Sequence, residues 1–170
     1  MSKNIVLVGL SGSGKTTIGK LLEQKINLKF IDTDEIIVNN ENRSINDIFA
    51  TDGEKFFRQI EFEVVRKVSE QNDLIISTGG GVVLNQENID NLKKNGIVFY
   101  LKTSVDTLIN RLKNDTTRPL LKTNDLRLKL EKMLLDRATF YEKADYIIKN
   151  DNDNIEQTVE NILRSYNERS

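Results

Sequence analysis

The stretch Gly9-Leu-Ser-Gly-Ser-Gly-Lys-Thr16 follows directly on the apolar run IVLV and has glycine at three of its eight positions. Glycine allows positive φ angles and lets main-chain N–H groups approach a ligand without a Cβ in the way. The stretch fits the pattern G-x-x-x-x-G-K-[ST], in which successive N–H groups surround a chain of phosphates. The lysine of this pattern reaches the terminal phosphates and its hydroxyl binds Mg²⁺. The alternative is a flexible Gly/Ser turn.

The flanks of this stretch decide between the two interpretations. Residues 5–8 are typical of a short buried strand, and Ile18, Leu21 and Leu22 have the spacing of one helix face. The loop therefore joins a strand to a helix N-terminus, where the helix dipole favours anions. We interpret it as a phosphate-binding loop whose expected ligand is a nucleoside triphosphate.

The composition limits which other sites the chain can build. A length of 170 residues predicts a single domain with a substantial core. The 25 Lys and Arg residues nearly balance the 26 Asp and Glu residues, so no overall field attracts nucleic acid or a membrane surface. The chain has no Cys and no His, which excludes disulfides, thiolate nucleophiles and imidazole chemistry. Carboxylates, Lys, Arg and a hard metal ion remain.

Only a few residues precede the first predicted strand, and no apolar run approaches the length that spans a membrane. These features indicate neither a signal peptide nor a membrane segment. We therefore expect a cytoplasmic protein.

Short apolar runs alternate with amphipathic segments along the chain. Strands are predicted at residues 5–8, 28–31, 74–76, 97–101 and 146–148, and helices at residues 17–25, 54–70, 104–113, 125–142 and 154–167. Alternation of this kind is typical of βαβ units, in which a parallel sheet is covered on both faces and ligands bind at the carboxyl ends of the strands.

Residues 114–124 are the one long irregular stretch, and they contain the only proline of the chain. Arg118 precedes this proline and is biased toward extended backbone, so the helix that begins near Ser104 should end before it. A charged loop of this length in a compact domain indicates a functional segment.

Two carboxylates, Asp32 and Asp34, follow the second predicted strand at positions i and i+2. Strand pleating would point both to the same side, at the edge where the phosphate loop lies. One could help to hold Mg²⁺ and the other could receive a substrate hydroxyl. The alternative is that Asp34 caps the next helix. Ser77 stands at the strand end where phosphate-loop proteins often have an aspartate for Mg²⁺, which favours Asp32 for that role.

Gly79, Gly80 and Gly81 follow that strand end directly. Three consecutive glycines indicate that the backbone comes close to a neighbour, and the carboxyl edge favours a small ligand over a plain tight turn.

Arg58 and Glu61 are one helical turn apart and could form an ordinary surface ion pair. Arg137 and Tyr141 share a helix face in the same way, with solvation or packing as the simple explanation. Together with Arg118, however, Arg58 and Arg137 could converge on one site, because forked guanidinium groups suit carboxylates and phosphates.

Taken together, these motifs resemble the shikimate kinases, and the resemblance covers nearly the whole chain in the same order. The matching segments are residues 9–17, 32–34, 53–54, 57–61, 77–81, 118–121 and 137–141. The resemblance implies MgATP-dependent phosphorylation of the 3-hydroxyl of shikimate in the chorismate pathway to aromatic amino acids. It also implies an α/β three-layer fold of the nucleoside-monophosphate-kinase type with a five-stranded parallel sheet in the order 2-3-1-4-5. Within the single domain, residues from about 33 to 61 would form a substrate-binding subdomain and residues from about 114 to 124 a mobile lid.

The resemblance assigns roles that the residues alone leave open. The residues implied to bind ATP are Gly12, Ser13, Gly14, Lys15, Thr16, Thr17, Arg111 and Arg118, with Arg111 packing on adenine. The residues implied to bind shikimate are Asp34, Arg58, Gly79, Gly80, Gly81 and Arg137, with the two arginines on the carboxylate. Thr16 and Asp32 would serve Mg²⁺, and Lys15, Asp34 and Arg118 would be catalytic, with Asp34 as a candidate proton acceptor. The expected partners are ATP and shikimate, with no nucleic acid or membrane, and the chain is expected to be a monomer.

Two other classes of function share the phosphate loop. A nucleotide-gated switch protein would carry the guanine-reading Asn-Lys-x-Asp motif, which is absent from the chain. A kinase for gluconate or a nucleoside monophosphate is the nearer alternative. The triple glycine, Asp34 and two arginines favour a compact polyol acid over a base or an open-chain sugar acid.

Overall fold

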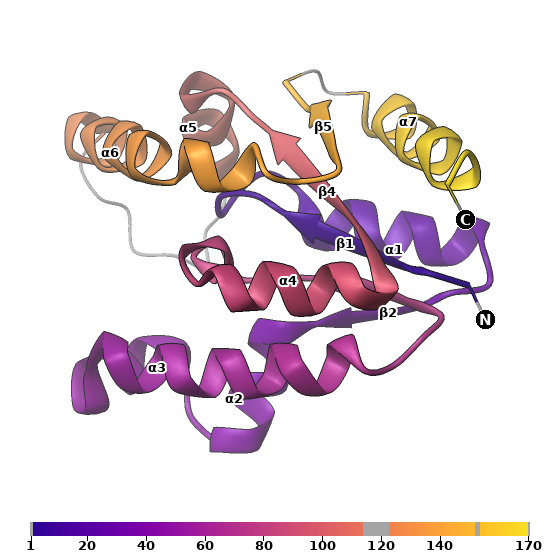
Figure 1. Cartoon of the computed structure of the whole chain (residues 1–170). Helices are drawn as coiled ribbons and strands as arrows, with labels where there is room; N and C mark the ends of the chain where they lie inside the picture. The colour runs from indigo at the N-terminus through magenta and orange to yellow at the C-terminus, as the bar shows by residue number, and fades with distance from the viewer. Residues whose placement is uncertain (1, 114–122, 152–153, 170) are drawn as a thin grey trace.

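The structure is a computed structural model that describes residues 2–113, 123–151 and 154–169. The described residues form a five-stranded parallel sheet in the order β2-β3-β1-β4-β5 with helices on both faces (Figure 1). The strands are β1 (Asn4–Val8), β2 (Lys29–Asp32), β3 (Leu74–Ser77), β4 (Gly96–Lys102) and β5 (Tyr146–Lys149). The helices are α1 (Lys15–Lys25), α2 (Thr33–Glu41), α3 (Ile45–Ser69), α4 (Gln86–Asn95), α5 (Val105–Lys113), α6 (Thr123–Tyr141) and α7 (Ile155–Asn167), with a 3₁₀ turn at Val82–Leu84.

The predicted fold class and strand order are confirmed, and each predicted strand agrees with the structure to within a residue or two at either end. β1 lies at the centre of the sheet and pairs with β3 on one side and β4 on the other. The loop that follows β1 is therefore at the middle of the carboxyl edge, where open α/β sheets bind their ligands.

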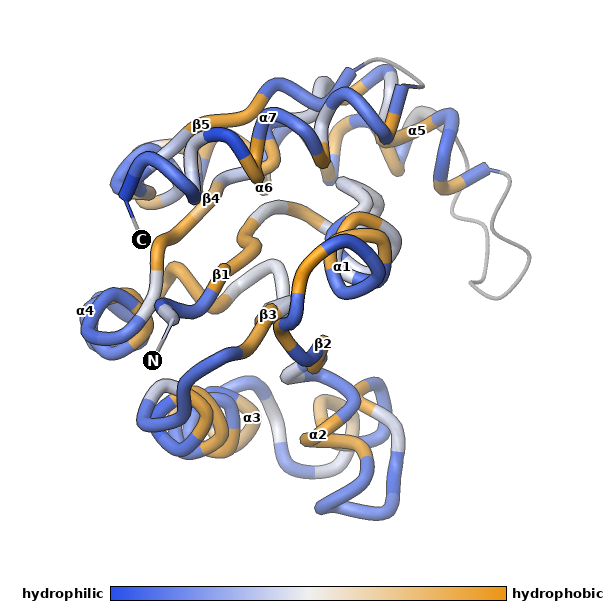
Figure 2. Tube along the Cα trace, turned by 90° about the vertical axis from the view of Figure 1, so that its right-hand side faces the viewer, coloured by the Kyte–Doolittle hydropathy of each residue, from blue (hydrophilic) through white to orange (hydrophobic). Residues whose placement is uncertain are grey.

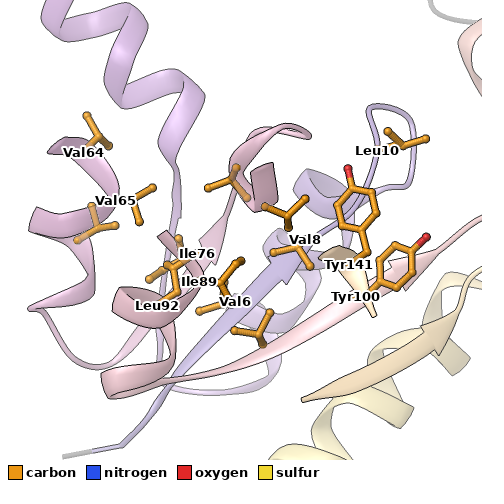
Figure 3. Packing of buried hydrophobic residues seen from close by; sticks show 14 of the residues in the cluster. Val6, Val8, Leu10, Val64, Val65, Ile76, Ile89, Leu92, Tyr100 and Tyr141 are labelled. Carbon is orange, nitrogen blue, oxygen red and sulfur yellow. The ribbon is translucent and has the colours of Figure 1, made fainter. Parts of the chain in front are cut away.

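Alternate residues of β1 enter two separate parts of the core. Ile5 and Leu7 belong to a cluster with residues of α1 and α7, while Val6 and Val8 belong to a cluster with residues of α3, α4, α5 and α6. Figure 2 shows the apolar residues along β3 and β4, and Figure 3 shows the second cluster in detail. A sheet buried on both faces explains why its strands are apolar runs without alternation.

One helix contains a break that the sequence explains. Within α3, Gly53 has a φ of 81° and a ψ of 172°, so the chain there leaves helical geometry. The predicted helix at residues 54–70 corresponds to the part of α3 after this break, and the part before it was not predicted. The substrate-binding subdomain expected at about residues 33–61 corresponds to α2 and to α3 as far as residue 61, and its role remains a prediction.

The irregular stretch predicted at residues 114–124 falls mostly outside the described residues, and with it Arg118. α6 begins at Thr123, two residues earlier than predicted. Among the described helices, none is both long enough and apolar enough to cross a membrane.

Candidate active site

The phosphate-binding loop lies between the end of β1 and the start of α1. Gly12 and Gly14 have φ angles of 86° and 89°, which residues with a Cβ rarely adopt, so both positions require glycine. Ser13 N donates to Leu10 O over 3.1 Å and closes the loop, and α1 begins directly after Gly14. A helix N-terminus therefore lies at the loop, as predicted, and favours an anion there.

Lys15 lies against the loop with its side chain largely buried. Its Nζ donates to the main-chain oxygens of Gly9 over 2.7 Å and Leu10 over 3.0 Å, and Ser13 Oγ lies 3.5 Å away. A positive charge thus stands beside the loop amides, where the lysine of this motif reaches terminal phosphates.

Asp32 ends β2 and is the N-cap of α2. Its Oδ1 accepts hydrogen bonds from Asp34 N over 2.9 Å and Glu35 N over 3.4 Å, and its Oδ2 accepts one from Thr16 Oγ1 over 3.3 Å. Two expectations are therefore corrected. The strand ends at Asp32, so strand pleating does not orient Asp34, and the helix is capped by Asp32 rather than by Asp34. Asp34 faces the site because it lies in the first turn of α2.

Thr16 and Asp32 present a hydroxyl and a carboxylate oxygen to one cavity, and oxygen donors of this kind fit Mg²⁺. Asp32 pairs in the sheet with Ser77, the residue that stands where an aspartate is common. Within the described ranges, no three His, Cys, Asp or Glu side chains are grouped closely enough to hold a metal ion. The donor set therefore fits an ion whose coordination is completed by phosphates and water, which is usual for Mg²⁺.

Asp34 is a carboxylate in an unfavourable environment. Its Oδ1 is buried and accepts no hydrogen bond from the part of the chain that the structure describes. Burial, and after it the negative charges of Asp32 and Glu61, raises the pKa of Asp34 to about 6. The positive charges of Lys15 and Arg58 oppose this shift of the pKa. A carboxyl group with a pKa near neutrality is suited to accept a proton from a bound hydroxyl.

Arg58 is held by two glutamates of its own helix. Its Nη1 lies 2.6 Å from Glu61 Oε2, and its Nη2 lies 3.3 Å from Glu54 Oε1. Glu61 is only 1% exposed, and burial raises its pKa although Arg58 opposes the shift. The interpretation of Arg58 and Glu61 as an ordinary surface pair is therefore wrong, because a buried carboxylate fixes the guanidinium. The spacing of the two residues was visible in the sequence, but the burial of Glu61 was not.

The glycines that follow β3 lie against these same side chains. A Cβ on Gly79 would be 2.7 Å from Asp34 Oδ1 and 3.1 Å from Glu61 Oε1, and a Cβ on Gly81 would overlap the Arg58 guanidinium. The sequence predicted that the backbone here comes close to a small ligand. In the structure, the close neighbours of Gly79 and Gly81 are side chains of the protein itself. The glycines thus make room for Asp34 and Arg58 at the edge of the sheet.

Gly80, the middle glycine of the turn, is contacted by residues of α6. The Tyr141 hydroxyl donates a hydrogen bond to Gly80 O, and the Tyr141 ring is stacked on Tyr100 with centroids 4.7 Å apart (Figure 3). Burial raises the pKa of Tyr141 to about 12, so the hydroxyl keeps the proton that it donates. Arg137 Nη1 lies 3.4 Å from the place of a Cβ on Gly80. Tyr141 and Arg137, which were predicted on one helix face, therefore lie in different places. Tyr141 is in the core, and Arg137 is beside the turn at residues 79–81.

A cavity of about 390 Å³ opens beside the phosphate loop. It is lined by Ser11, Gly12, Gly14, Lys15, Thr16, Thr17, Asp32, Asp34, Glu35, Ser77, Thr78, Gly80, Arg111 and Leu112. Of the predicted site residues that the structure describes, Ser13, Arg58, Gly79, Gly81 and Arg137 do not line this cavity. Ser13 is buried in the loop, and the other four lie around Asp34 and Gly80 as described above.

Arg111, on α5, also lines the cavity. Its Nη1 donates to Gly12 O over 3.3 Å and its Nη2 donates to Asn150 O over 3.0 Å. Its predicted contact with adenine stays a prediction. Sequence reasoning named no residue from the segment at 149–152 and so missed Asn150, which contacts the phosphate loop. An asparagine directly after a strand was the only signal in the sequence.

The family model for shikimate kinase matches residues 11–167. The chain belongs to the shikimate kinase family. A shikimate kinase from Caldicellulosiruptor bescii is 45% identical over 149 residues, which is 88% of this chain and 87% of that protein. The structure of a shikimate kinase from Acinetobacter baumannii in complex with shikimate superimposes with a TM-score of 0.91 at 33% identity, covering 100% of this chain and 96% of the other.

Other kinases share the fold but are more distant. A gluconokinase from Sinorhizobium meliloti superimposes with a TM-score of 0.63 at 16% identity, over 98% of this chain and 92% of that one. At this level of identity the likeness shows the fold alone. Membership of the shikimate kinase family therefore rests on the first two similarities and on the family model.

Proposed function

We propose that this chain transfers the γ-phosphoryl group of ATP to the 3-hydroxyl of shikimate, forming shikimate 3-phosphate and ADP. The observation that carries the proposal is the turn at residues 79–81, which brings Asp34, Arg58 and Arg137 together beside the phosphate loop. Shikimate has one carboxylate and several hydroxyls. Guanidinium groups suit the carboxylate, and a protein carboxylate can accept hydrogen bonds from the hydroxyls. The structural relative from Acinetobacter baumannii was solved with shikimate bound, which supports the same substrate here.

On the nucleotide side, Lys15 and the loop amides would hold the β and γ phosphates. Thr16 and Asp32 would hold Mg²⁺, which when bound supplies positive charge to the phosphates. Arg111 would pack on adenine. Arg118, which lies outside the described residues, would approach the transferring phosphate from the lid.

On the acceptor side, Arg58 and Arg137 would grip the carboxylate and so fix which hydroxyl reaches the phosphate. Asp34 would accept a hydrogen bond from that hydroxyl and then take its proton. The hydroxyl oxygen forms the new bond to phosphorus as the bond between the γ phosphorus and the bridging oxygen breaks, and ADP leaves. The pKa of about 6 leaves Asp34 mostly ionised at pH 7 and above, as this role requires.

We also propose that the product belongs to the chorismate pathway and that the enzyme acts in the cytoplasm. We further propose that the enzyme is a monomer, and mass measurement in solution by light scattering tests this.

The test of the proposed function is the release of ADP from MgATP with shikimate, quinate, gluconate and AMP compared as acceptors. We expect shikimate to give by far the highest kcat/KM, and the Lys15→Ala variant, which lacks the phosphate-loop charge, to give the background rate. Preference for gluconate or AMP would overturn the proposed acceptor, while the kinase assignment would stand.

A further inference from the structure

Asn150, the residue that follows β5, makes a set of contacts that the sequence did not indicate. It is 1% exposed although it carries an amide. Its Nδ2 donates to Ser13 O over 2.6 Å, across 137 positions of sequence. Its Oδ1 accepts from Thr158 Oγ1 over 3.0 Å. A buried amide with both ends bonded is fixed in one orientation, because turning it over would break both bonds.

The main chain of Asn150 is fixed as well. Its N–H donates to Lys102 O over 2.9 Å, which continues the pairing of β5 with β4. Its carbonyl oxygen accepts from Arg111 Nη2 over 3.0 Å, and the other nitrogen of that guanidinium bonds to Gly12 O. The phosphate loop is therefore tied to the sheet and to α7 through one residue.

The bond to Ser13 O acts on one peptide plane. The Ser13 carbonyl and the Gly14 N–H belong to the same trans peptide, in which the oxygen and the hydrogen point in opposite directions. The hydrogen bond that holds the Ser13 oxygen toward Asn150 therefore points the Gly14 N–H away from Asn150. Gly14 lines the cavity beside the loop, and Asn150 Nδ2 lies 3.6 Å from the place of a Cβ on Gly14.

We propose that Asn150 is a positioning residue for the phosphate loop. Its amide holds the Ser13–Gly14 peptide in the orientation that phosphates require, and so it raises nucleotide affinity without touching the nucleotide. A loop with glycines on both sides of Ser13 has many alternative conformations, and holding it in one of them lowers the entropic cost of binding. This inference rests on the proposed function only for the nature of the ligand, which is a polyphosphate.

The test uses Asn150→Leu, which keeps the approximate shape and adds no charge, and Asn150→Ala as a second, smaller variant. The matched control is the same pair of substitutions at Asn4, a buried asparagine of β1. Asn4 also makes two side-chain hydrogen bonds, to Gln71 O over 2.8 Å and from Leu74 N over 2.9 Å, and it lies at the opposite end of the strand from the loop.

Dissociation constants are measured by calorimetry for MgADP and for inorganic tripolyphosphate, and melting temperatures are measured alongside. Neither ligand requires an acceptor substrate, so the result does not depend on shikimate being the correct one. We expect the Asn150 variants to bind both ligands about tenfold more weakly, roughly the effect of losing one well-placed hydrogen bond. The melting temperatures of the Asn4 variants should fall about as much as those of the Asn150 variants. The Asn4 variants should nevertheless bind both ligands with dissociation constants within twofold of those of the original protein.

Two results would overturn the inference. If the Asn150 variants bound tripolyphosphate normally, Asn150 would not act through the loop, and a loss confined to MgADP would point to Arg111 and adenine instead. If the Asn4 variants lost as much affinity as the Asn150 variants, the effect would be general destabilisation.

Discussion

Asp34 is the residue whose surroundings bear most directly on the proposed catalysis. Its buried Oδ1 faces Gly79 beside Glu61, and its pKa of about 6 is set mainly by burial and next by Asp32 and Glu61. The same features that make the charged form costly also make it a good acceptor for the proton of a hydroxyl.

Replacing Asp34 by Asn should lower kcat by about a hundredfold or more, which is the low end of what a positioned proton acceptor contributes. In the original enzyme, kcat/KM for shikimate should fall as the pH drops below about 6, because Asp34 becomes protonated. The variant should lack this acidic limb. Steady-state kinetics between pH 5 and pH 9 measure both effects, and an Asn variant with an unchanged kcat would remove Asp34 from the chemistry.

The same pKa predicts how stability depends on pH. Because the pKa of Asp34 rises from 3.8 to about 6 on folding, the folded protein binds more protons than the unfolded chain between these values. The contribution of Asp34 to stability is thus present below about pH 4 and is lost as the pH rises through 6. At ~1.4 kcal/mol for each pKa unit, the loss is on the order of 3 kcal/mol. Asp34→Asn should therefore gain stability relative to the original protein as the pH rises from 4 to 8. Urea unfolding at the two pH values measures the gain, and an equal stability difference at both would contradict the shifted pKa.

At the scale of elements, the turn after β3 contacts two parts of the proposed acceptor site. Gly79 lies against Asp34 and Gly81 lies against Arg58, so a methyl group at either position displaces one side chain. Gly81 has a φ of −94°, which alanine also adopts, so backbone strain does not obscure the effect there.

We expect Gly81→Ala to raise KM for shikimate at least about tenfold, because the Arg58 guanidinium must move away from its place, with a smaller effect on kcat. Gly79→Ala should instead act chiefly on kcat through Asp34. The melting temperature should also fall for Gly81→Ala, because moving the guanidinium separates Arg58 from the buried carboxylate of Glu61. Identical kinetic effects of the two substitutions would contradict this division.

Some features of the site could be predicted from the sequence, and others, such as the contacts of this turn, could not. The phosphate loop was predictable because its residues act through contiguous backbone and a helix N-terminus that follows at once. Three glycines in a row predicted a close approach, but not to what, because Gly81 and Arg58 meet only after α3 packs beside β3. The orientation of Asp34 was predicted for the wrong reason, because β2 ends at Asp32 and Asp34 lies in the first turn of α2. The contacts of Asn150 join segments 137 positions apart and left no local pattern.

For the whole molecule, the strand order was predictable from the resemblance, and the alternation of apolar runs with amphipathic helices already indicated a parallel sheet. The part of the chain that carries Arg118 lies outside the described residues, and the lid assigned to residues 114–124 remains a prediction.

If residues 114–124 close over the phosphates, hydrogen exchange there should be fast in the protein alone and slower when ADP and shikimate are both present. Arg118→Ala should then lower kcat by roughly a thousandfold, as loss of an arginine finger does, with a much smaller effect on KM for shikimate. Exchange that is the same in both samples, together with a fully active Arg118→Ala enzyme, would leave this segment without a catalytic role.

The central claim is that Asp34, Arg58 and Arg137 together present one particular hydroxyl of shikimate to ATP. The most direct test is phosphorus NMR of the product formed from shikimate and MgATP. The account predicts a single phosphate monoester whose phosphorus couples to the proton on C3, formed together with one equivalent of ADP. Coupling to the proton on C4 or C5, or ADP release without any phosphorylated shikimate, would contradict it.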